Sequence, residues 1–334
     1  MNLGVIGRNF VVDSMMQAVS LTPGVNIKAI YSRTKEGADI FGEKYGVSRR
    51  YTDLCGLAAD DEVDAVYIAS PNYAHYGQAK LMLSAGKHVF LEKPFTPTLA
   101  EARELFDLAR RQGVVLLEAM MPAHSPALEE IRELLPRLGV LRQAHFSFCQ
   151  YSSRYDKFRA GIVENAFRPE LCNGALMDLG VYCAEMLVML FGMPKVVSAD
   201  SVFLSTGVDG ETTALLRYPE TTAVLSASKI TQATLPSFVA GENGTLEIDW
   251  MSHPEKFTLK LRGCDPEIVD AAPALPTMCY ELADFLRCIE DRSLADRFER
   301  YTLDTVALLE EIRKSAGINF SGEAPRPISD EVLS

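Results

Sequence analysis

Three residues in this chain carry side chains that could exchange a proton beside a carbon centre. Lys93 lies in "FLEKPFTP", where an apolar run ends in two opposite charges in front of a proline. Asp178 and Tyr182 lie in "ALMDLGVY", four residues apart, and on a helix they would share one face. Each has a structural alternative: a solvated lysine at a strand end, a carboxylate in the first turn of a helix, and a core tyrosine.

Together the three residues would suit the redox chemistry of an alcohol. When a carbon gives or takes a hydride, its oxygen must exchange a proton, and a phenol could be that acid or base. The pKa of a phenol, about 10, makes it a poor base near neutral pH unless a nearby ammonium favours its anion. We therefore expect Lys93 to lower the pKa of Tyr182. Asp178 is expected to orient a substrate hydroxyl or to tune the other two groups.

Lys93 would need a neighbouring strand end to complete a site. A second apolar run ends in a similar way, in "IASPNYAH". Pro71 and Pro94 push the residues before them toward extended geometry, which aims Ser70 and Lys93 rather than folding them into a helix. If the two strands are neighbours in a parallel sheet, both ends overhang the crevice where ligands bind. Glu92 would then contact a cofactor or balance the ammonium charge.

The first strand end, in "GVIGRNFVV", offers part of a phosphate-binding turn. The dinucleotide fingerprint is G-x-G-x-x-G, and here the strand is followed by Gly7, Arg8, Asn9 and Phe10. Gly7 can make the tight turn. Asn9 stands where the second glycine lets the backbone approach a pyrophosphate, and Asn tolerates a left-handed φ better than most residues. We expect these four residues to bind a cofactor, with an ordinary strand–helix turn as the alternative.

The second strand end, in "AIYSRT", bears on the choice of cofactor. Folds that bind NAD usually place an acidic residue there for the ribose 2′-hydroxyl, whereas this chain has Ser32 and Arg33. A hydroxyl beside a guanidinium suits a 2′-phosphate. NADP is therefore the expected cofactor, with NAD as the alternative, and an ordinary solvated arginine is the structural alternative.

These strand ends require a sheet that places them side by side. In residues 1–121, short apolar runs alternate with helical patterns, which predicts a doubly wound parallel sheet covered on both faces, a Rossmann domain for a dinucleotide. The predicted strands are Leu3–Ile6, Ile27–Tyr31, Asp64–Ala69, Lys87–Leu91 and Val114–Leu117. The predicted helices include one with Phe10, Val11, Met15 and Val19 on one face, then Tyr73–Ala85 and Leu99–Gln112.

After residue 121 the pattern changes. Strands follow one another without intervening helices, from Val196–Leu204 to Phe257–Leu261, which predicts an open, mainly antiparallel sheet. Helices are expected at Ala175–Leu190, Cys279–Glu290 and Tyr301–Ala316. We therefore expect an α/β protein in which residues 122–334 form an α+β domain for substrate binding and dimerisation. Its last helix could pack back on the first domain.

Composition limits the class of partner. The chain has 334 residues, 48% of them hydrophobic, with a formal net charge of -12 and a pI near 5.0. Such acidity argues against nucleic acid or an anionic membrane as a partner. Seven scattered cysteines, none spaced C-x-x-C, indicate reduced thiols and give no metal-site pattern. The start shows no signal-peptide pattern and no run has the length of a membrane span, so we expect a cytoplasmic protein.

Several motifs, in order, resemble the Gfo/Idh/MocA family of NAD(P)-dependent oxidoreductases. The hallmark of that family, Glu-Lys-Pro at a strand end, is matched by Glu92, Lys93 and Pro94. The stretches "DAVYIASPNYAHYGQAKLMLSAGKHVFLEKP", "EAMM", "NGALMDLGVYCAEMLVMLFG" and "ENGTLEID" also look like the family, over nearly the whole chain. The resemblance implies that Lys93, Asp178 and Tyr182 form the catalytic group. Many members have His at the position of Tyr182, and the Tyr form is similar to the branch that contains dimeric dihydrodiol dehydrogenases.

The family pattern implies further contacts. "NAFRPELCNGAL" resembles a Trp-Arg element before a glycine run, and Arg168 is therefore expected on the nicotinamide or phosphate side. In that element, Cys172 and Asn173 replace two glycines. The residues expected at the cofactor near the two proline-marked strand ends are Ser70, Pro71, Asn72, His75, Glu92 and Lys93. His124 and Tyr151 are expected in the substrate pocket, although a lone histidine such as His75 is as often structural.

The expected activity is hydride transfer between NADP and a secondary alcohol or ketone of a sugar, cyclitol or trans-dihydrodiol. By the resemblance, the protein is expected to be a homodimer. The alternative from another class is a regulator of the same fold that binds a dinucleotide without turnover. A regulator would need neither Lys93 nor Tyr182.

Overall fold

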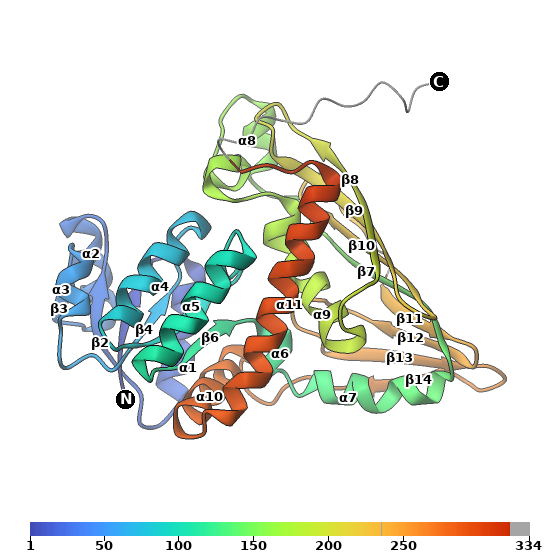
Figure 1. Cartoon of the computed structure of the whole chain (residues 1–334), viewed down its shortest axis with the longest axis horizontal. Coiled ribbons are helices and arrows are strands. Elements are labelled where there is room, and N and C mark those ends of the chain that lie inside the picture. Colours follow the sequence, from blue (N-terminus) through green and yellow to red (C-terminus); the bar gives the residue numbers. More distant parts are fainter. Residues whose placement is uncertain (235, 321–334) are drawn as a thin grey trace.

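Two β-sheets and the helices packed on them make up the protein (Figure 1). The computed structural model describes residues 1–234 and 236–320. The end of the predicted second domain, residues 321–334, lies outside the described residues.

The N-terminal sheet is parallel, with the strand order β3-β2-β1-β4-β5-β6. Its strands are β1 (Asn2–Ile6), β2 (Asn26–Tyr31), β3 (Arg49–Tyr51), β4 (Ala65–Ile68), β5 (His88–Glu92) and β6 (Leu116–Ala119). The order switches direction between β1 and β4, and in open α/β sheets ligands bind at such a point. The predicted Rossmann fold is confirmed. β3 was not expected, because its three residues contain no apolar run.

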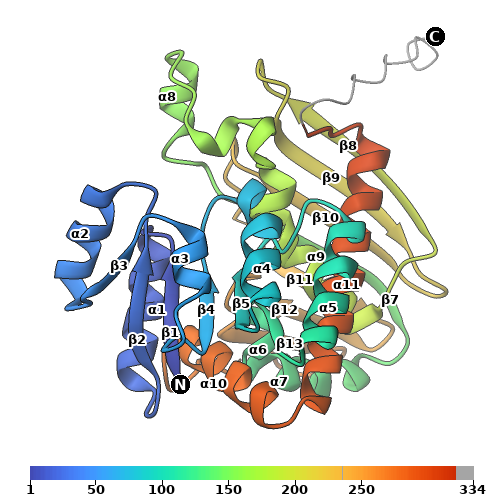
Figure 2. The ribbon, with the colours of Figure 1, turned by 60° about the vertical axis from the view of Figure 1, so that its left-hand side comes forward.

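Helices cover both faces of this sheet (Figure 2). One face carries α3 (Leu54–Ala58), α4 (His75–Ser84) and α5 (Leu99–Gln112), and the other carries α1 (Phe10–Leu21), α2 (Lys35–Tyr45) and α10 (Thr277–Glu290). Local sequence fixes the ends of α5, since Thr98 and Glu101 form a capping box and Gly113 closes the helix in the left-handed region. The apolar face predicted for α1 is correct for Met15 and Val19 and wrong for Phe10. Phe10 is 75% exposed because, as the first residue of α1, it lies beyond the part that packs.

The C-terminal sheet is mainly antiparallel, as predicted, in the order β14-β13-β12-β11-β7-β10-β9-β8. Among the strand pairs of the described residues in this sheet, β7 and β10 are the one parallel pair. Its strands are β7 (Leu141–Cys149), β8 (Val196–Phe203), β9 (Asp209–Arg217), β10 (Thr222–Ser228), β11 (Ser237–Gly241), β12 (Gly244–Ile248), β13 (Lys256–Leu261) and β14 (Glu267–Asp270). β14 was not predicted from the sequence, because it is a short, largely exposed edge strand. Inner-face residues such as Ala214, Leu216 and Leu225 are fully buried.

The remaining helices lie on the inner face of this sheet and between the two sheets, except α8, which projects beyond the sheets at the top of the molecule (Figure 2). They are α6 (Met121–His124), α7 (Ala127–Leu134), α8 (Tyr155–Arg159), a π-helical turn (Leu176–Gly180), α9 (Val181–Phe191) and α11 (Ser293–Ala316). α11 contacts α5 and β6 on one side and α9 and β8 on the other. Our expectation that no run has the length of a membrane span is wrong for Pro169–Phe191, which is long and apolar enough to cross a membrane. However, 78% of its most apolar window is buried inside the protein. Burial of that kind is typical of a core helix.

A buried carboxyl group joins two of these helices. Glu185 of α9 is 1% exposed and accepts a hydrogen bond from Thr305 of α11. Burial raises the pKa of Glu185 from 4.5 to about 7, and the Thr305 hydroxyl offsets only part of this shift. Because the folded state favours the protonated carboxyl, this group stabilises the fold at low pH.

The free energy of unfolding should therefore fall as the pH rises from about 4.5 through about 7, the window between the ordinary and the raised pKa. Glu185→Gln keeps the shape of the side chain and cannot ionise, so we expect a flatter pH dependence in urea unfolding curves. Glu43→Gln, on a side chain 74% exposed, is the matched control and should leave the slope unchanged. An unchanged slope in Glu185→Gln would contradict the assignment.

Candidate active site

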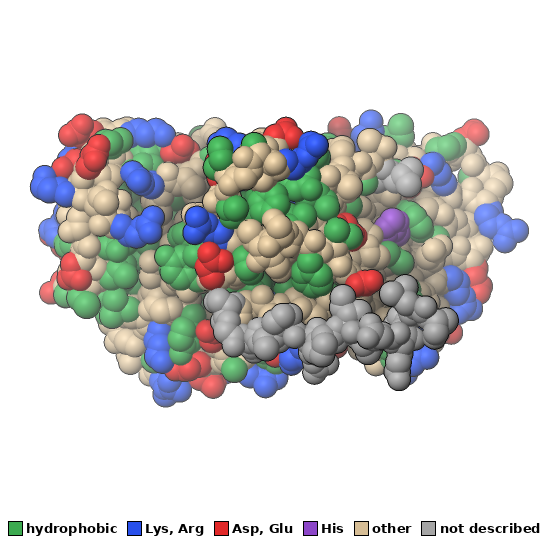
Figure 3. Space-filling view, turned by 90° about the horizontal axis from the view of Figure 1, so that it is seen from above, with side chains coloured by type: hydrophobic (Ala, Val, Ile, Leu, Met, Phe, Trp, Pro, Cys, Tyr) green, Lys and Arg blue, Asp and Glu red, His purple; other side chains and the backbone are tan. Residues whose placement is uncertain are grey.

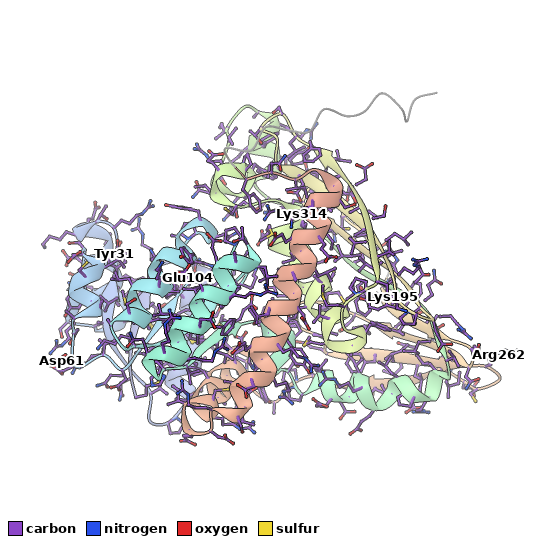
Figure 4. All side chains as sticks on the ribbon, viewed as in Figure 1. Tyr31, Asp61, Glu104, Lys195, Arg262 and Lys314 are labelled. Carbon is purple, nitrogen blue, oxygen red and sulfur yellow. The ribbon has the colours of Figure 1, made fainter. Side chains whose placement is uncertain are left out.

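A cavity of about 640 Å³ runs along the carboxyl ends of β1, β2 and β4 and continues to the second domain. Tyr31 is one of its lining residues (Figure 4). It lies on the side of the first domain that faces away from the large sheet, whereas Lys195 and Arg262 lie at that sheet. Eight of the predicted cofactor residues line the cavity: Gly7, Arg8, Asn9, Ser32, Arg33, Ser70, Pro71 and Asn72. Of the predicted catalytic residues, Asp178 lines it as well. The two sets come from different domains, so the cavity spans the junction.

The turn after β1 is shaped by Gly7 and Asn9. Gly7 has φ +124, and a Cβ there would lie 2.5 Å from the carbonyl oxygen of Ala69. Asn9 does not use the left-handed region that we expected: its φ is -90, and its side chain accepts a hydrogen bond from Val12 N at the start of α1. Asn9 also donates to the Ala69 oxygen at 3.3 Å. The turn thus holds the N-terminus of α1, with its free N–H groups, at the cavity.

Polar groups converge at the end of β2. A Cβ placed on Gly37 would lie 2.6 Å from Ser32 Oγ, 2.8 Å from Arg8 Nη1 and 2.9 Å from Thr34 Oγ1. Thr34 caps α2, so the N-terminus of a second helix opens at the same place. Arg33 lines this end of the cavity and is exposed. Two guanidinium groups, two hydroxyls and a helix N-terminus form a set of donors for an anionic group.

Asn72 joins the two domains at the middle of the cavity. Its amide donates to the carbonyl oxygen of Cys172 at 2.9 Å and to Asn173 Oδ1 at 3.1 Å. Cys172 has φ +56, a left-handed conformation that a glycine adopts without strain. Cys172, which stands where we expected the family to have a glycine, therefore adopts a conformation that favours glycine.

Lys93, Asp178 and Tyr182 lie together, as the sequence predicts. The Lys93 ammonium donates to the backbone oxygen of Asp178 at 3.0 Å and to its Oδ1 at 3.1 Å. The same Nζ lies 4.8 Å from the centre of the Tyr182 ring. Lys93 directly follows β5, and the π-helical turn and the start of α9 supply the other two. A second lysine, Lys229, contacts the other carboxylate oxygen, Asp178 Oδ2, at 2.7 Å.

Burial and these charges decide the protonation states. Burial alone would lower the pKa of Lys93, but attraction by Tyr182, Asp178 and Glu92 outweighs it and raises that pKa. Burial alone would raise the pKa of Asp178, but Lys93 and Lys229 hold it well below its usual range. For Tyr182 our expectation of a lowered pKa is wrong. Burial raises its pKa to about 12, and the opposing effect of Lys93 is smaller. The phenol is therefore protonated near neutral pH.

Glu92 lies behind the cavity rather than in it. It is 8% exposed and accepts a hydrogen bond of 2.5 Å from the buried hydroxyl of Tyr67. Burial raises the pKa of Glu92 to about 7. Contact with a cofactor, one of its two expected roles, does not fit this position. The other role, balance of the Lys93 charge, fits the electrostatics.

Lys93 and Tyr182 are not among the residues that line the cavity, although Lys93 contacts the lining residue Asp178. Four further predicted residues make other contacts and lie outside the lining as well. His75 is fully buried, and its ring nitrogens face the carbonyl oxygens of Pro94 and Ser70 at 3.0 and 2.9 Å, so it links the two strand ends. His124 is buried against Asp284 and the ring of Phe298. The remaining two lie on the second domain: the Tyr151 hydroxyl bonds Asp156, and Arg168 pairs with Glu170. Phe10, although next to the turn, is also outside the lining.

Both parts of the chain match one protein family. Residues 1–120 match the "Oxidoreductase family, NAD-binding Rossmann fold", and residues 129–247 match the "GFO/IDH/MocA C-terminal domain". The chain belongs to the Gfo/Idh/MocA oxidoreductase family. It is 42% identical over 322 residues to the NADP(+)-dependent scyllo-inositol 2-dehydrogenase IolU of Bacillus subtilis, covering 96% of this chain and 98% of the relative.

Two further similarities extend over nearly the full length of this Gfo/Idh/MocA protein. Trans-1,2-dihydrobenzene-1,2-diol dehydrogenase of mouse is 29% identical over 338 residues, covering 95% of this chain and 97% of the relative. The crystal structure of KijD10, a 3-ketoreductase from Actinomadura kijaniata in complex with NADP and TDP-benzene, superposes with a TM-score of 0.85 at 24% identity, covering 95% and 98% of the two chains. That structural match shows a shared fold.

Several residues at the site of this Gfo/Idh/MocA protein were missed from the sequence. Lys229, at the end of β10, has no motif around it, and its partner Asp178 is distant in sequence. Arg154, Glu164 and Asn165 line the second-domain side of the cavity from an irregular segment between β7 and α9. Loops of this kind have no periodicity from which a side chain's direction could be read. Only the family pattern around "NAFRP" pointed to this segment.

Gly7→Ala should destabilise the fold by roughly 1–3 kcal/mol, since the added Cβ meets a backbone oxygen at 2.5 Å in a conformation that disfavours side chains. It should also weaken NADPH binding, measured by nucleotide fluorescence. Gly24→Ala is a matched control: Gly24 also has positive φ (+82), but a Cβ there would meet nothing within 4 Å. Equal effects of the two changes on stability and on NADPH binding would contradict the role of the Gly7–Ala69 contact.

Proposed function

We propose that this protein is an NADP-dependent dehydrogenase that moves a hydride between the nicotinamide and a secondary alcohol carbon of a cyclitol, sugar or dihydrodiol. The observation that carries the proposal is the convergence of Lys93, Asp178 and Tyr182, from two domains, beside a cavity with dinucleotide geometry. Family membership and the NADP-linked relatives support the same activity. When bound, NADP supplies the hydride donor or acceptor.

The cavity residues fit NADP. The tight turn at Gly7 and the N-terminus of α1 offer backbone N–H groups to the pyrophosphate. Arg8, Ser32 and Arg33, with the N-terminus of α2, would hold the 2′-phosphate. NAD would leave these cationic groups without an anionic partner, and it is therefore the second choice.

Lys93 and Tyr182 would carry out the exchange of a proton with the substrate oxygen. Two N–H groups of the Lys93 ammonium are used by Asp178, which leaves the third for the substrate oxygen. In ketone reduction, the protonated phenol of Tyr182 donates its proton to the oxygen as the carbon receives the hydride. In alcohol oxidation the proton passes the other way, to the tyrosinate, whose formation the nearby ammonium favours. High pH should thus favour the oxidative direction.

The second-domain side of the cavity favours a polyhydroxylated substrate. Its lining residues are Arg154, Glu164, Asn165, Asn173 and Asp178, with polar side chains suited to hydroxyl groups, and one apolar residue, Ala166. An aromatic dihydrodiol would need an apolar wall there. A cyclitol or sugar is therefore the preferred substrate class, in line with the activity named for the relative that is 42% identical.

A dinucleotide-binding regulator without turnover is the alternative. It would bind NADP through the same turn and the same donors at β2. The discriminating feature is the catalytic group, because a sensor has no use for a part-buried lysine that contacts an aspartate and a tyrosine ring. We therefore place the regulator second.

We also propose a homodimer, a two-domain division at residue 121 and a cytoplasmic location. Among the described helices, all that contact the eight-stranded sheet lie on its inner face (Figure 1). The opposite face exposes Val202, Leu215 and Ile268, each at least half exposed, which a second copy could cover.

On the face seen from above, basic and acidic side chains are interspersed (Figure 3), and a small molecule remains the expected partner.

Tyr182→Phe should lower kcat roughly 10²–10⁴-fold, the usual effect of losing a general acid or base, while the Kd for NADPH stays the same. Initial rates with NADP and a panel of cyclitols, sugars and dihydrodiols would provide the measurement. Tyr151→Phe is the matched control, since that hydroxyl bonds Asp156 outside the cavity, and it should retain full activity. A Tyr182→Phe enzyme with the wild-type rate would exclude the acid–base role.

Arg33→Ala should weaken NADPH roughly tenfold or more and change NADH little, because a charge-assisted contact to the 2′-phosphate is lost. Fluorescence titrations with both reduced cofactors give the two Kd values. Arg262→Ala, at a site distant from Tyr31 in Figure 4, controls for the loss of a surface charge. Equal weakening of NADPH and NADH by Arg33→Ala would argue against this phosphate site.

A further inference from the structure

We propose that Lys229 is a positioning residue for the reaction: it fixes the orientation of the Asp178 carboxylate, and through it the place of the Lys93 ammonium at the substrate oxygen. The proposal rests on the dehydrogenase function proposed above. None of the motifs that mark the site includes Lys229.

Lys229 occupies a fixed, buried place. Its side chain is 5% exposed, and its Nζ lies 2.7 Å from Asp178 Oδ2 and 5.7 Å from the ring centre of Phe167. Its backbone is held on both sides, because its N–H donates to Gly210 O and its carbonyl accepts from Ser152 N, each at 2.9 Å. An exposed lysine such as Lys260, whose side chain is 48% exposed, lacks this enclosure of the ammonium, so the Lys229 ammonium is part of a built arrangement.

The two carboxylate oxygens of Asp178 therefore bind different lysines. Oδ1 accepts from Lys93, and Oδ2 accepts from Lys229. The terminal torsion of an aspartate is broad, so a carboxylate held by one lysine could turn and carry that lysine's ammonium with it. The second ion pair removes this freedom. It also helps to keep Asp178 ionised, since loss of one nearby opposite charge raises a carboxyl pKa by about 1–3 units.

The charges around Lys229 support the same role. With Lys93 and Asp178 alone the pair is neutral, and Lys229 adds a positive charge where an alkoxide forms during hydride transfer. A second carboxyl group, that of Asp209, is fully buried and is attracted by Lys229. Asp209 accepts a hydrogen bond from Leu176 N at 2.7 Å, which fixes the start of the helical segment that carries Asp178. Attraction by Lys229 is one of the effects that oppose the burial-raised pKa of Asp209.

A double-mutant cycle tests the proposal. Lys229→Met should lower kcat/KM for the best cyclitol or sugar substrate roughly 10- to 100-fold, the scale of a small misplacement of catalytic groups, without changing the Kd for NADPH. In the Asp178→Asn background the same change should cost less than about threefold, because the carboxylate that Lys229 holds is gone. Lys229→Arg keeps the charge and should recover part of the activity. Lys260→Met, which removes an exposed lysine paired with Glu247, should stay within about twofold of wild type.

Each result decides a different point. Equal losses from Lys229→Met in both backgrounds, or equal losses from the Arg and Met variants, would overturn the positioning role while leaving the dehydrogenase in place. If wild type turns over none of the substrates with either cofactor, the proposed function falls, and the role of Lys229 falls with it. If Lys229→Met shows no cooperative unfolding transition in urea, Lys229→Gln takes its place in the cycle. A folded Lys229→Met that no longer binds NADPH would overturn the positioning role.

Discussion

The ion pair between Lys93 and Asp178 is the contact on which the rest of the site depends. It joins the end of β5 in one domain to a helical turn of the other. The Lys93 side chain is 15% exposed, and a charge so largely removed from water is costly unless it is paired and hydrogen-bonded. The fold must therefore hold the two domains in register for Lys93 to be stable there. Asn72 adds a second link across the same junction. Cofactor and substrate would thus meet only where the two domains are in contact.

Burial then gives each group of the site its protonation state. The same desolvation that keeps Tyr182 protonated would lower the pKa of Lys93, were it not for the attraction by Tyr182, Asp178 and Glu92. Asp178 is held ionised by two lysines, which makes it a poor proton acceptor and a good anchor. The phenol remains as the group that can pass a proton. The different roles of Asp178 and Tyr182 therefore follow from where the fold places two common side chains.

The sequence predicted the parts of the site that belong to regular elements and motifs. Strand and proline patterns located Ser70 and Lys93 at neighbouring strand ends, and helical spacing put Asp178 beside Tyr182. It could not predict the pKa of Tyr182, because burial depends on how the second domain packs. His75 was ambiguous for the same reason, and the structure surrounds it with carbonyl groups. The ion pair of Lys229 with Asp178 could not be predicted either, because it joins segments that are distant in sequence and meet only in the fold.

The most direct test of the account is the fate of the hydrogen on the reacting carbon. The protein would be incubated with NADP and a cyclitol or sugar deuterated at its carbinol positions, and the reduced cofactor analysed by mass spectrometry and NMR. The account predicts deuterium on one face of the nicotinamide C4, with none lost to water. Reduced cofactor that carries solvent hydrogen, or deuterium released to water without reduction, would contradict direct hydride transfer at this site.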